Sequence, residues 1–176
     1  MLLSALLDSA VRRPDAANRY AKKVATVSEL LAQARIALVD VPREALGVEK
    51  VGRFRGTRFV RAGSAWHLGV LLLTDDGVLA TGEVLRAAAA VRRGYPAESA
   101  RARAERRAQA RKGGFAEGEV VHLGWVAVDI AAVERGGESG PLLMTDGVPM
   151  VRWSAAAQPR ELAGHLQEQV ELATSV

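Results

Sequence analysis

Apolar and polar positions follow two different periods along this chain, and the period changes near Val51. Before that point the apolar positions recur at helical spacing. Leucines at i, i+3 and i+4 predict a short amphipathic helix over residues 2–12, which Pro14 would end. A second helix is predicted to begin after the capping box Thr26-Val27-Ser28-Glu29 and to continue to Leu38.

Beyond that point the pattern becomes typical of strands. Residues 66–73 form a nearly continuous apolar run, which predicts one central strand buried on both faces. Asp76-Gly77 is a hairpin turn signal, so residues 78–85 are expected to return antiparallel. Another strand is predicted over 119–130, and a second hairpin with similar turn chemistry over 141–153.

Two further helices are predicted in the second half of the chain. One covers residues 97–112 and ends at Gly113-Gly114, and the other begins at Pro159. We therefore expect an α+β fold, a mostly antiparallel sheet of five or six strands with helices packed mainly on one face. Residues 1–25 would form an N-terminal helical arm and linker, and residues 26–176 a single α+β domain.

The composition is that of a globular domain, with 49% hydrophobic and 25% charged residues among 176. The absence of cysteine excludes disulfide scaffolds, cysteine zinc sites, iron–sulfur clusters and cysteine nucleophiles. No apolar run approaches the ~18 residues of a membrane-spanning helix, and the N-terminus lacks the basic region of a secretion signal. We therefore expect a cytoplasmic protein without membrane contact.

Charge is distributed unevenly. Residues 1–114 carry 21 basic and 11 acidic residues, a net charge of +10, whereas residues 115–176 carry 3 and 9, a net charge of −6. The basic half suggests nucleic-acid binding as an alternative function. Arginine side chains can pair with phosphates, and the phenylalanine rings that lie between them in the sequence can stack on bases. The arginines that would form this face are Arg53, Arg55, Arg58, Arg61, Arg103, Arg107 and Arg111.

Catalytic motifs are sparse. The chain has no phosphate-binding glycine loop, and no serine is followed three residues later by lysine. The candidate pocket residues are His67, Glu83 and His122, which lie on predicted strands and could carry out acid–base chemistry if their side chains share a face. A metal ion on the same three residues would require three strands to align, so we expect neither a metal nor a cofactor.

Three strings of the sequence resemble a family of small uncharacterised actinobacterial proteins, some of which are labelled glutaminase. They are A-W-H-L-G-V-L-L-L at 65–73, A-T-G-E at 80–83 and G-G-F-A-E-G-E at 113–119, and the resemblance covers roughly residues 50–170. The resemblance assigns no catalytic residue, because the chain has neither the S-x-x-K pair of serine-type glutaminases nor a cysteine for the amidotransferase type.

The functional expectation is a non-catalytic domain that acts by protein–protein association, as a homodimer or with another protein. Leucines of residues 2–12 would supply an apolar face for it, because so short a helix needs a surface to dock on. Two alternatives stay open: nucleic-acid binding through the arginine-rich face, and hydrolysis of a small molecule by an amidase-like or glutaminase-like activity.

Overall fold

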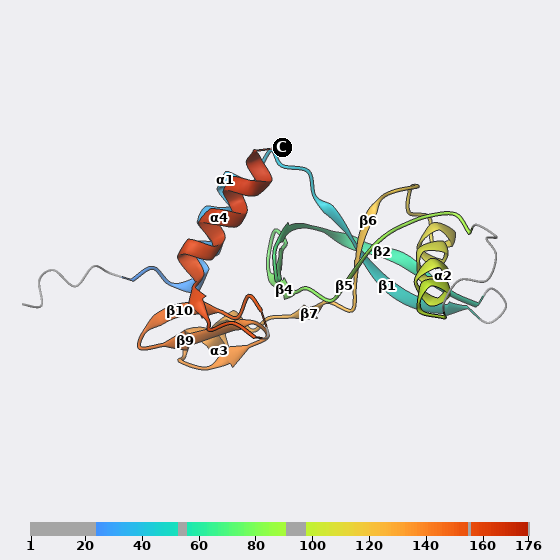
Figure 1. Cartoon of the computed structure of the whole chain (residues 1–176). Coiled ribbons are helices and arrows are strands. Elements are labelled where there is room, and N and C mark those ends of the chain that lie inside the picture. Colours follow the sequence, from blue (N-terminus) through green and yellow to red (C-terminus); the bar gives the residue numbers. More distant parts are fainter. Residues whose placement is uncertain (1–23, 53–55, 91–97, 155, 176) are drawn as a thin grey trace, which may run out of the picture.

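The computed structural model describes residues 24–52, 56–90, 98–154 and 156–175 of the chain (Figure 1). The helix predicted over residues 2–12, and almost all of the arm predicted over residues 1–25, lie outside the described residues. The division into an arm and a single domain therefore stays a prediction.

The described strands form two sheets. The larger sheet has seven strands in the order β5 (Glu83–Arg86), β6 (Val120–Leu123), β1 (Glu44–Gly52), β2 (Gly56–Leu68), β3 (Leu71–Leu73), β4 (Val78–Ala80) and β7 (Val126–Ala127). The smaller sheet has four, in the order β11 (Arg160–Glu161), β10 (Val148–Val151), β9 (Leu142–Thr145) and β8 (Glu138–Ser139). The helices of the described ranges are α1 (Val27–Ala37), α2 (Glu98–Lys112), α3 (Ile130–Glu134) and α4 (Leu162–Thr174).

Strand pairing among the described residues is antiparallel throughout, except between β1 and β6. There the strands run parallel, with Ala45 beside Val121 and Leu46 beside His122. The predicted α+β class with a mostly antiparallel sheet is confirmed. The strands are more numerous than the five or six expected, because the larger sheet alone has seven and short β-segments form a second sheet of four.

Local sequence signals account for several of these elements. Thr26 caps α1 by accepting a hydrogen bond from the Glu29 amide at 3.1 Å, while the Glu29 carboxylate accepts one from the Thr26 amide at 2.9 Å. This capping box was predicted from the sequence, and it satisfies two amides that the first turn of a helix leaves without partners. The hairpin at Asp76-Gly77 is also confirmed, since it joins β3 to β4.

The prediction of one continuous strand over residues 66–73 is wrong. β2 ends at Leu68 and β3 begins at Leu71, so the apolar run contains a tight turn. Gly69 makes the turn possible by adopting φ +67°, a left-handed conformation that costs glycine little. The run therefore supplies two adjacent strands, in which Trp66 pairs with Leu73 across the hairpin.

The strand register sorts side chains between the two faces of the larger sheet, because successive residues point to opposite sides. One face carries Ala45 and Val121, which pack against α2, and farther along β2 it carries Trp66 and Leu68, which pack near α1 and α4. Helices thus cover mainly one face, as expected. The other face carries a smaller cluster of Leu46, Ala65 and Leu72, with Leu79 and Trp125 at its edge.

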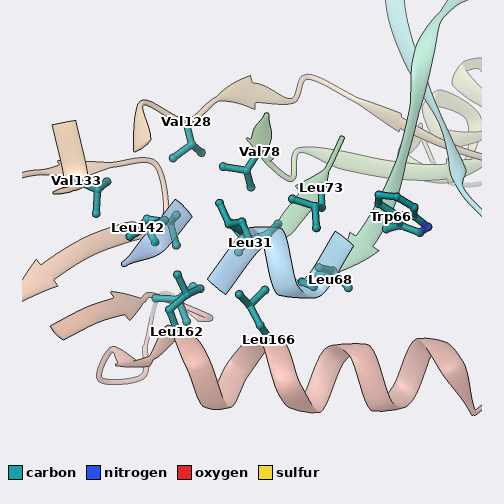
Figure 2. Packing of buried hydrophobic residues seen from close by; sticks show 14 of the residues in the cluster. Leu31, Trp66, Leu68, Leu73, Val78, Val128, Val133, Leu142, Leu162 and Leu166 are labelled. Atoms are coloured by element: carbon teal, nitrogen blue, oxygen red, sulfur yellow. The ribbon is translucent and has the colours of Figure 1, made fainter. Parts of the chain in front are cut away.

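The main core joins the two sheets through the helices. Figure 2 shows Leu31 of α1 beside Leu166 of α4, Leu142 of β9 and Leu73 of β3. Each of these side chains is at least 95% buried, and burial of one leucine contributes roughly 1.5–3 kcal/mol before entropy costs. This core holds the C-terminal hairpins against the end of the larger sheet, near the turn at Gly69.

Candidate functional site

Three polar side chains meet on the face of the larger sheet that α2 leaves uncovered. Glu44 opens β1, the strand between β2 and β6. It pairs with Ala65, two residues before His67 on β2, while Leu46 pairs with His122 on β6. Since steps of two residues keep side chains on one face, the register alone brings Glu44, His67 and His122 together.

The two imidazole rings converge on one carboxylate oxygen of Glu44. Oε2 of Glu44 lies 2.5 Å from Nε2 of His122 and 3.5 Å from Nδ1 of His67. The two imidazole rings stand edge to face, with centroids 4.7 Å apart. One donor atom from each of the three residues lies within 4.8 Å of the others, a spacing that a single metal ion could bridge after small side-chain rotations.

His67 is held in a defined orientation by the hairpin turn that follows it. Its Nε2 lies 2.9 Å from the carbonyl oxygen of Gly69, which can only accept, so Nε2 carries the proton and donates. In a neutral ring of this tautomer, Nδ1 is the nitrogen that carries the lone pair, and it faces Glu44. Metal-binding histidines commonly donate their second N–H to a backbone carbonyl in this way, because the bond fixes both tautomer and ring angle.

His122 is completely buried, and its burial disfavours the charged form of the ring. Removal from water lowers its pKa below the ordinary histidine value, and the nearby His67 lowers it further, while the hydrogen bond to Glu44 acts in the opposite direction. Nε2 donates its proton to Glu44, and the buried Nδ1 has no hydrogen-bond partner among the described residues. A neutral imidazole is the form that binds metal ions.

A metal ion on Nε2 of His122 would displace that proton to Nδ1. A buried N–H without an acceptor costs about 1–3 kcal/mol, whereas a complete zinc site contributes roughly 10–16 kcal/mol. The tautomer change is therefore small beside the gain from three metal–ligand bonds. Two imidazoles and one carboxylate are also a ligand set that leaves a fourth position open, as in catalytic zinc sites.

The open side of the cluster faces a cavity of about 320 Å³. Glu44 and His67 form part of its wall, together with Val84, Arg86 and Val120 from the neighbouring strands. A small ligand could reach the cluster through this cavity without any rearrangement of the sheet.

Glu83, the carboxylate proposed from the sequence as a pocket residue, does not join the two histidines. On β5, Glu83 pairs with Leu123 and Val84 pairs with His122, so Glu83 points to the opposite face of the sheet. There its carboxylate forms a salt bridge of 2.5 Å with Arg106 of α2. The sequence could not fix this register, and a shift of one residue decides which face a side chain occupies.

Glu44 was not identified from the sequence, because the strand that carries it begins seven residues before the predicted change of period at Val51. A signal for the histidines was present, however. The repeated string His-Leu-Gly, at 67–69 and 122–124, marks two equivalent strand ends, and Gly69 and Gly124 both adopt left-handed φ values of +67° and +63°. Each histidine thus occupies the same place in its strand.

The arginines proposed to bind nucleic acid are only partly brought together. Arg53 and Arg55 lie outside the described residues, and Arg58 points to the sheet face opposite that of its neighbour Phe59, which is buried against α2.

Arg61 forms an ion pair with Glu119, and Arg111 forms one of 3.2 Å with Glu117. Arg107 donates to the Arg86 carbonyl at 2.9 Å, and Arg103 is exposed on the same helix.

A second surface feature lies between α1 and α4. It is a groove of about 440 Å³, whose apolar lining consists of Leu30, Ala34, Ala37, Ala163, Leu166 and Val170. We call it the α1/α4 groove. Ile36, Val39 and Leu172 are large, exposed apolar side chains on or just beyond the same two helices.

No described helix is both long enough and apolar enough to cross a membrane. Comparison of the chain with protein-family models, with curated proteins and with solved structures finds no match. The likeness to the actinobacterial family stays an expectation, and the site must be interpreted from its own geometry.

Proposed function

We propose that this domain binds a divalent transition-metal ion of the zinc class through Glu44, His67 and His122. The observation that carries the proposal is the position of Glu44 Oε2, 2.5 Å from one imidazole nitrogen and 3.5 Å from another. Support comes from the Gly69 carbonyl, which leaves His67 Nδ1 free to bind a metal. Imidazole nitrogen and carboxylate oxygen are ligands that suit zinc and its neighbours in the transition series.

A metal at this position would supply chemistry for which the sequence contains no catalytic motif. Zinc with three protein ligands lowers the pKa of a bound water to about 7 and so generates a nucleophile at neutral pH. Hydrolysis of a small substrate, one alternative from the sequence, would then need neither a nucleophilic serine nor a cysteine. The cavity beside the cluster would give such a substrate access to a metal ion held by the three residues.

The test is metal binding by the full chain after treatment with a chelator. Isothermal titration with Zn²⁺, and visible absorption of the Co²⁺-loaded protein, should both show one site per chain. H67Q and E44Q should weaken binding by at least about 100-fold, since loss of a ligand costs more than the ~10–100-fold of an outer-shell change. His67 is the preferred target because its side chain is one-third exposed, so its replacement disturbs packing little.

E83Q provides a matched control, because it removes a strand carboxylate from the opposite face of the sheet. It should bind the metal as the unmodified chain does. Equal binding by E44Q and E83Q, or no binding by the unmodified chain, would contradict the proposal.

Association with another protein, or with a second copy as a homodimer, is our second proposal, and the α1/α4 groove favours it. Six of the nine residues that line the groove are apolar, and three of these are alanines, which leave room for an added helix. We place the protein in the cytoplasm as part of the same proposal, on the basis of its sequence. Nucleic-acid binding is a less favoured alternative, because Arg61 and Arg111 already have carboxylate partners and are less available to phosphates.

A further inference from the structure

The cavity beside the candidate metal site carries one positive side chain on the same face of the sheet. Val84 pairs with His122 and Arg86 pairs with Val120. Residues 84 and 86 are two positions apart, so Arg86 shares the face of His122 and Glu44. Arg86 and the two exposed ligands, Glu44 and His67, line the same cavity of about 320 Å³.

The guanidinium of Arg86 is largely uncommitted. Within the described residues it forms no ion pair, and its hydrogen bond to the Gly118 carbonyl is long, at 3.4 Å. Three arginines on the opposite side of the sheet, Arg61, Arg106 and Arg111, differ in that each has a glutamate partner. Arg86 therefore has N–H donors available to a ligand in the cavity.

We propose that Arg86 and the metal ion together bind a small oxyanion, a phosphate or carboxylate group of the ligand, across this cavity. The inference rests on the proposed metal site. A guanidinium can donate two parallel hydrogen bonds to two oxygens of a carboxylate or phosphate. A divalent ion can bind a third oxygen of a phosphate, or one of the two oxygens that accept from the guanidinium. The cavity is at the lower end of the 300–1,000 Å³ usual for ligand pockets, which favours a small ligand.

The experiment uses the full chain loaded with Co²⁺, with inorganic phosphate and acetate as separate probes. Binding of a probe to the metal should shift the visible absorption of Co²⁺, and the relative affinities identify which oxyanion the site prefers. R86Q should weaken probe binding by about 10–100-fold, because hydrogen bonds to charged groups are worth about twice neutral ones. It should not weaken Co²⁺ binding, because Arg86 is not a metal ligand and its charge repels a cation, and R86K should retain part of the probe affinity.

R103Q serves as the control, since Arg103 is an exposed arginine of α2, on the other side of the sheet. It should bind both probes as the unmodified chain does. Equal probe binding by R86Q and R103Q would overturn the role of Arg86, and the absence of any probe effect on metal-loaded protein would overturn the oxyanion site while leaving the metal site intact. Failure to bind Co²⁺ would overturn both proposals.

Discussion

The carbonyl oxygen of Gly69 accepts a hydrogen bond of 2.9 Å from Nε2 of His67, two residues earlier in the chain. Gly69 is also the turn residue that separates β2 from β3, and its φ of +67° requires glycine. The conformation of one hairpin turn therefore sets the orientation of a candidate metal ligand.

Replacement of Gly69 by alanine should disturb both fold and site. A Cβ at Gly69 would lie 3.2 Å from Cε1 of His165, in addition to the backbone strain. We expect G69A to lower the free energy of unfolding by about 1–3 kcal/mol and to weaken metal binding. Urea denaturation and Zn²⁺ titration measure the two effects.

G56A is the matched control for this variant. Gly56 has nearly the same φ, +65°, but no atom lies within 4 Å of its added Cβ, and it is at the far end of β2. It should lose stability through backbone strain alone and keep its metal affinity. If G69A and G56A bind metal equally well, the turn does not orient His67.

Stability should fall as the pH is lowered from about 7 to 5, and His165 is one cause. Burial lowers the pKa of His165 below the ordinary value of about 6.5, and the charge of Arg160 lowers it further, while the hydrogen bond to Leu68 and the charge of Glu168 act in the opposite direction. The unfolded chain then binds more protons than the folded chain as the pH falls through 6.5, so acid favours unfolding.

H165Q should make this pH dependence shallower. In the folded chain Arg160 donates to Nδ1 of His165 at 2.6 Å, and Nε2 donates to the Leu68 carbonyl at 3.2 Å, and a glutamine amide offers the same two functions. Urea denaturation at several pH values, with chelator present, gives the slope. Measurements above pH 5 do not include the titration of Asp75 and Glu119, because hydrogen bonds and ion pairs with arginine lower the pKa values of both carboxylates. An unchanged slope in H165Q would exclude His165 as a cause.

The core between the two sheets should be sensitive to loss of volume at Leu31. This side chain of α1 is fully buried, and Figure 2 shows it among leucines and valines of both sheets and α4. L31A should lower the free energy of unfolding by about 2–5 kcal/mol. L172A, a leucine of α4 that is 59% exposed, should change it by less than about 0.5 kcal/mol. Thermal or urea unfolding compares the two, and equal losses would contradict the assignment of the core.

A charge placed in the α1/α4 groove should reduce association without unfolding the domain. Ala163 lines the groove but is exposed, so A163E leaves the core intact. Sedimentation velocity should show a smaller dimer fraction for A163E than for A102E, which adds the same charge at an exposed alanine of α2. Deletion of residues 1–14 tests whether the leucines of that segment contribute to the same contact. Equal dimer fractions in all three chains would remove the proposed role of the groove.

Local signals predicted much of this fold. The capping box at Thr26 and the turn at Asp76-Gly77 depend only on residues a few positions apart, so the sequence shows them directly. The break at Gly69 was missed because a single glycine inside an apolar run does not reveal its φ angle. The antiparallel class and the helices α1, α2 and α4 could thus be predicted. The turn within the longest apolar run could not, and the single strand predicted over 119–130 is wrong, because that segment forms β6 and β7 and is followed by the short helix α3.

The candidate site was predictable only in part, because it depends on register between strands distant in sequence. His67 and His122 were named from the sequence as candidate pocket residues, and the pairing of β1 with both neighbouring strands places them on one face. Choosing Glu44 instead of Glu83 as their carboxylate partner would have required knowing that Val84, not Glu83, lies opposite His122. A sequence without strand alignment does not contain that information.

The parallel pairing of β1 with β6 also determines when the site is assembled during synthesis of the chain. Glu44 and His67 belong to strands joined by one hairpin, so they can meet soon after both are made. His122 is 78 residues from Glu44, and it must close a long loop that includes α2 before it reaches β1. We therefore expect a nascent chain to have only a two-ligand site, which binds metal weakly, until β6 has left the ribosome. Tight metal binding would then indicate that β6 has joined the larger sheet.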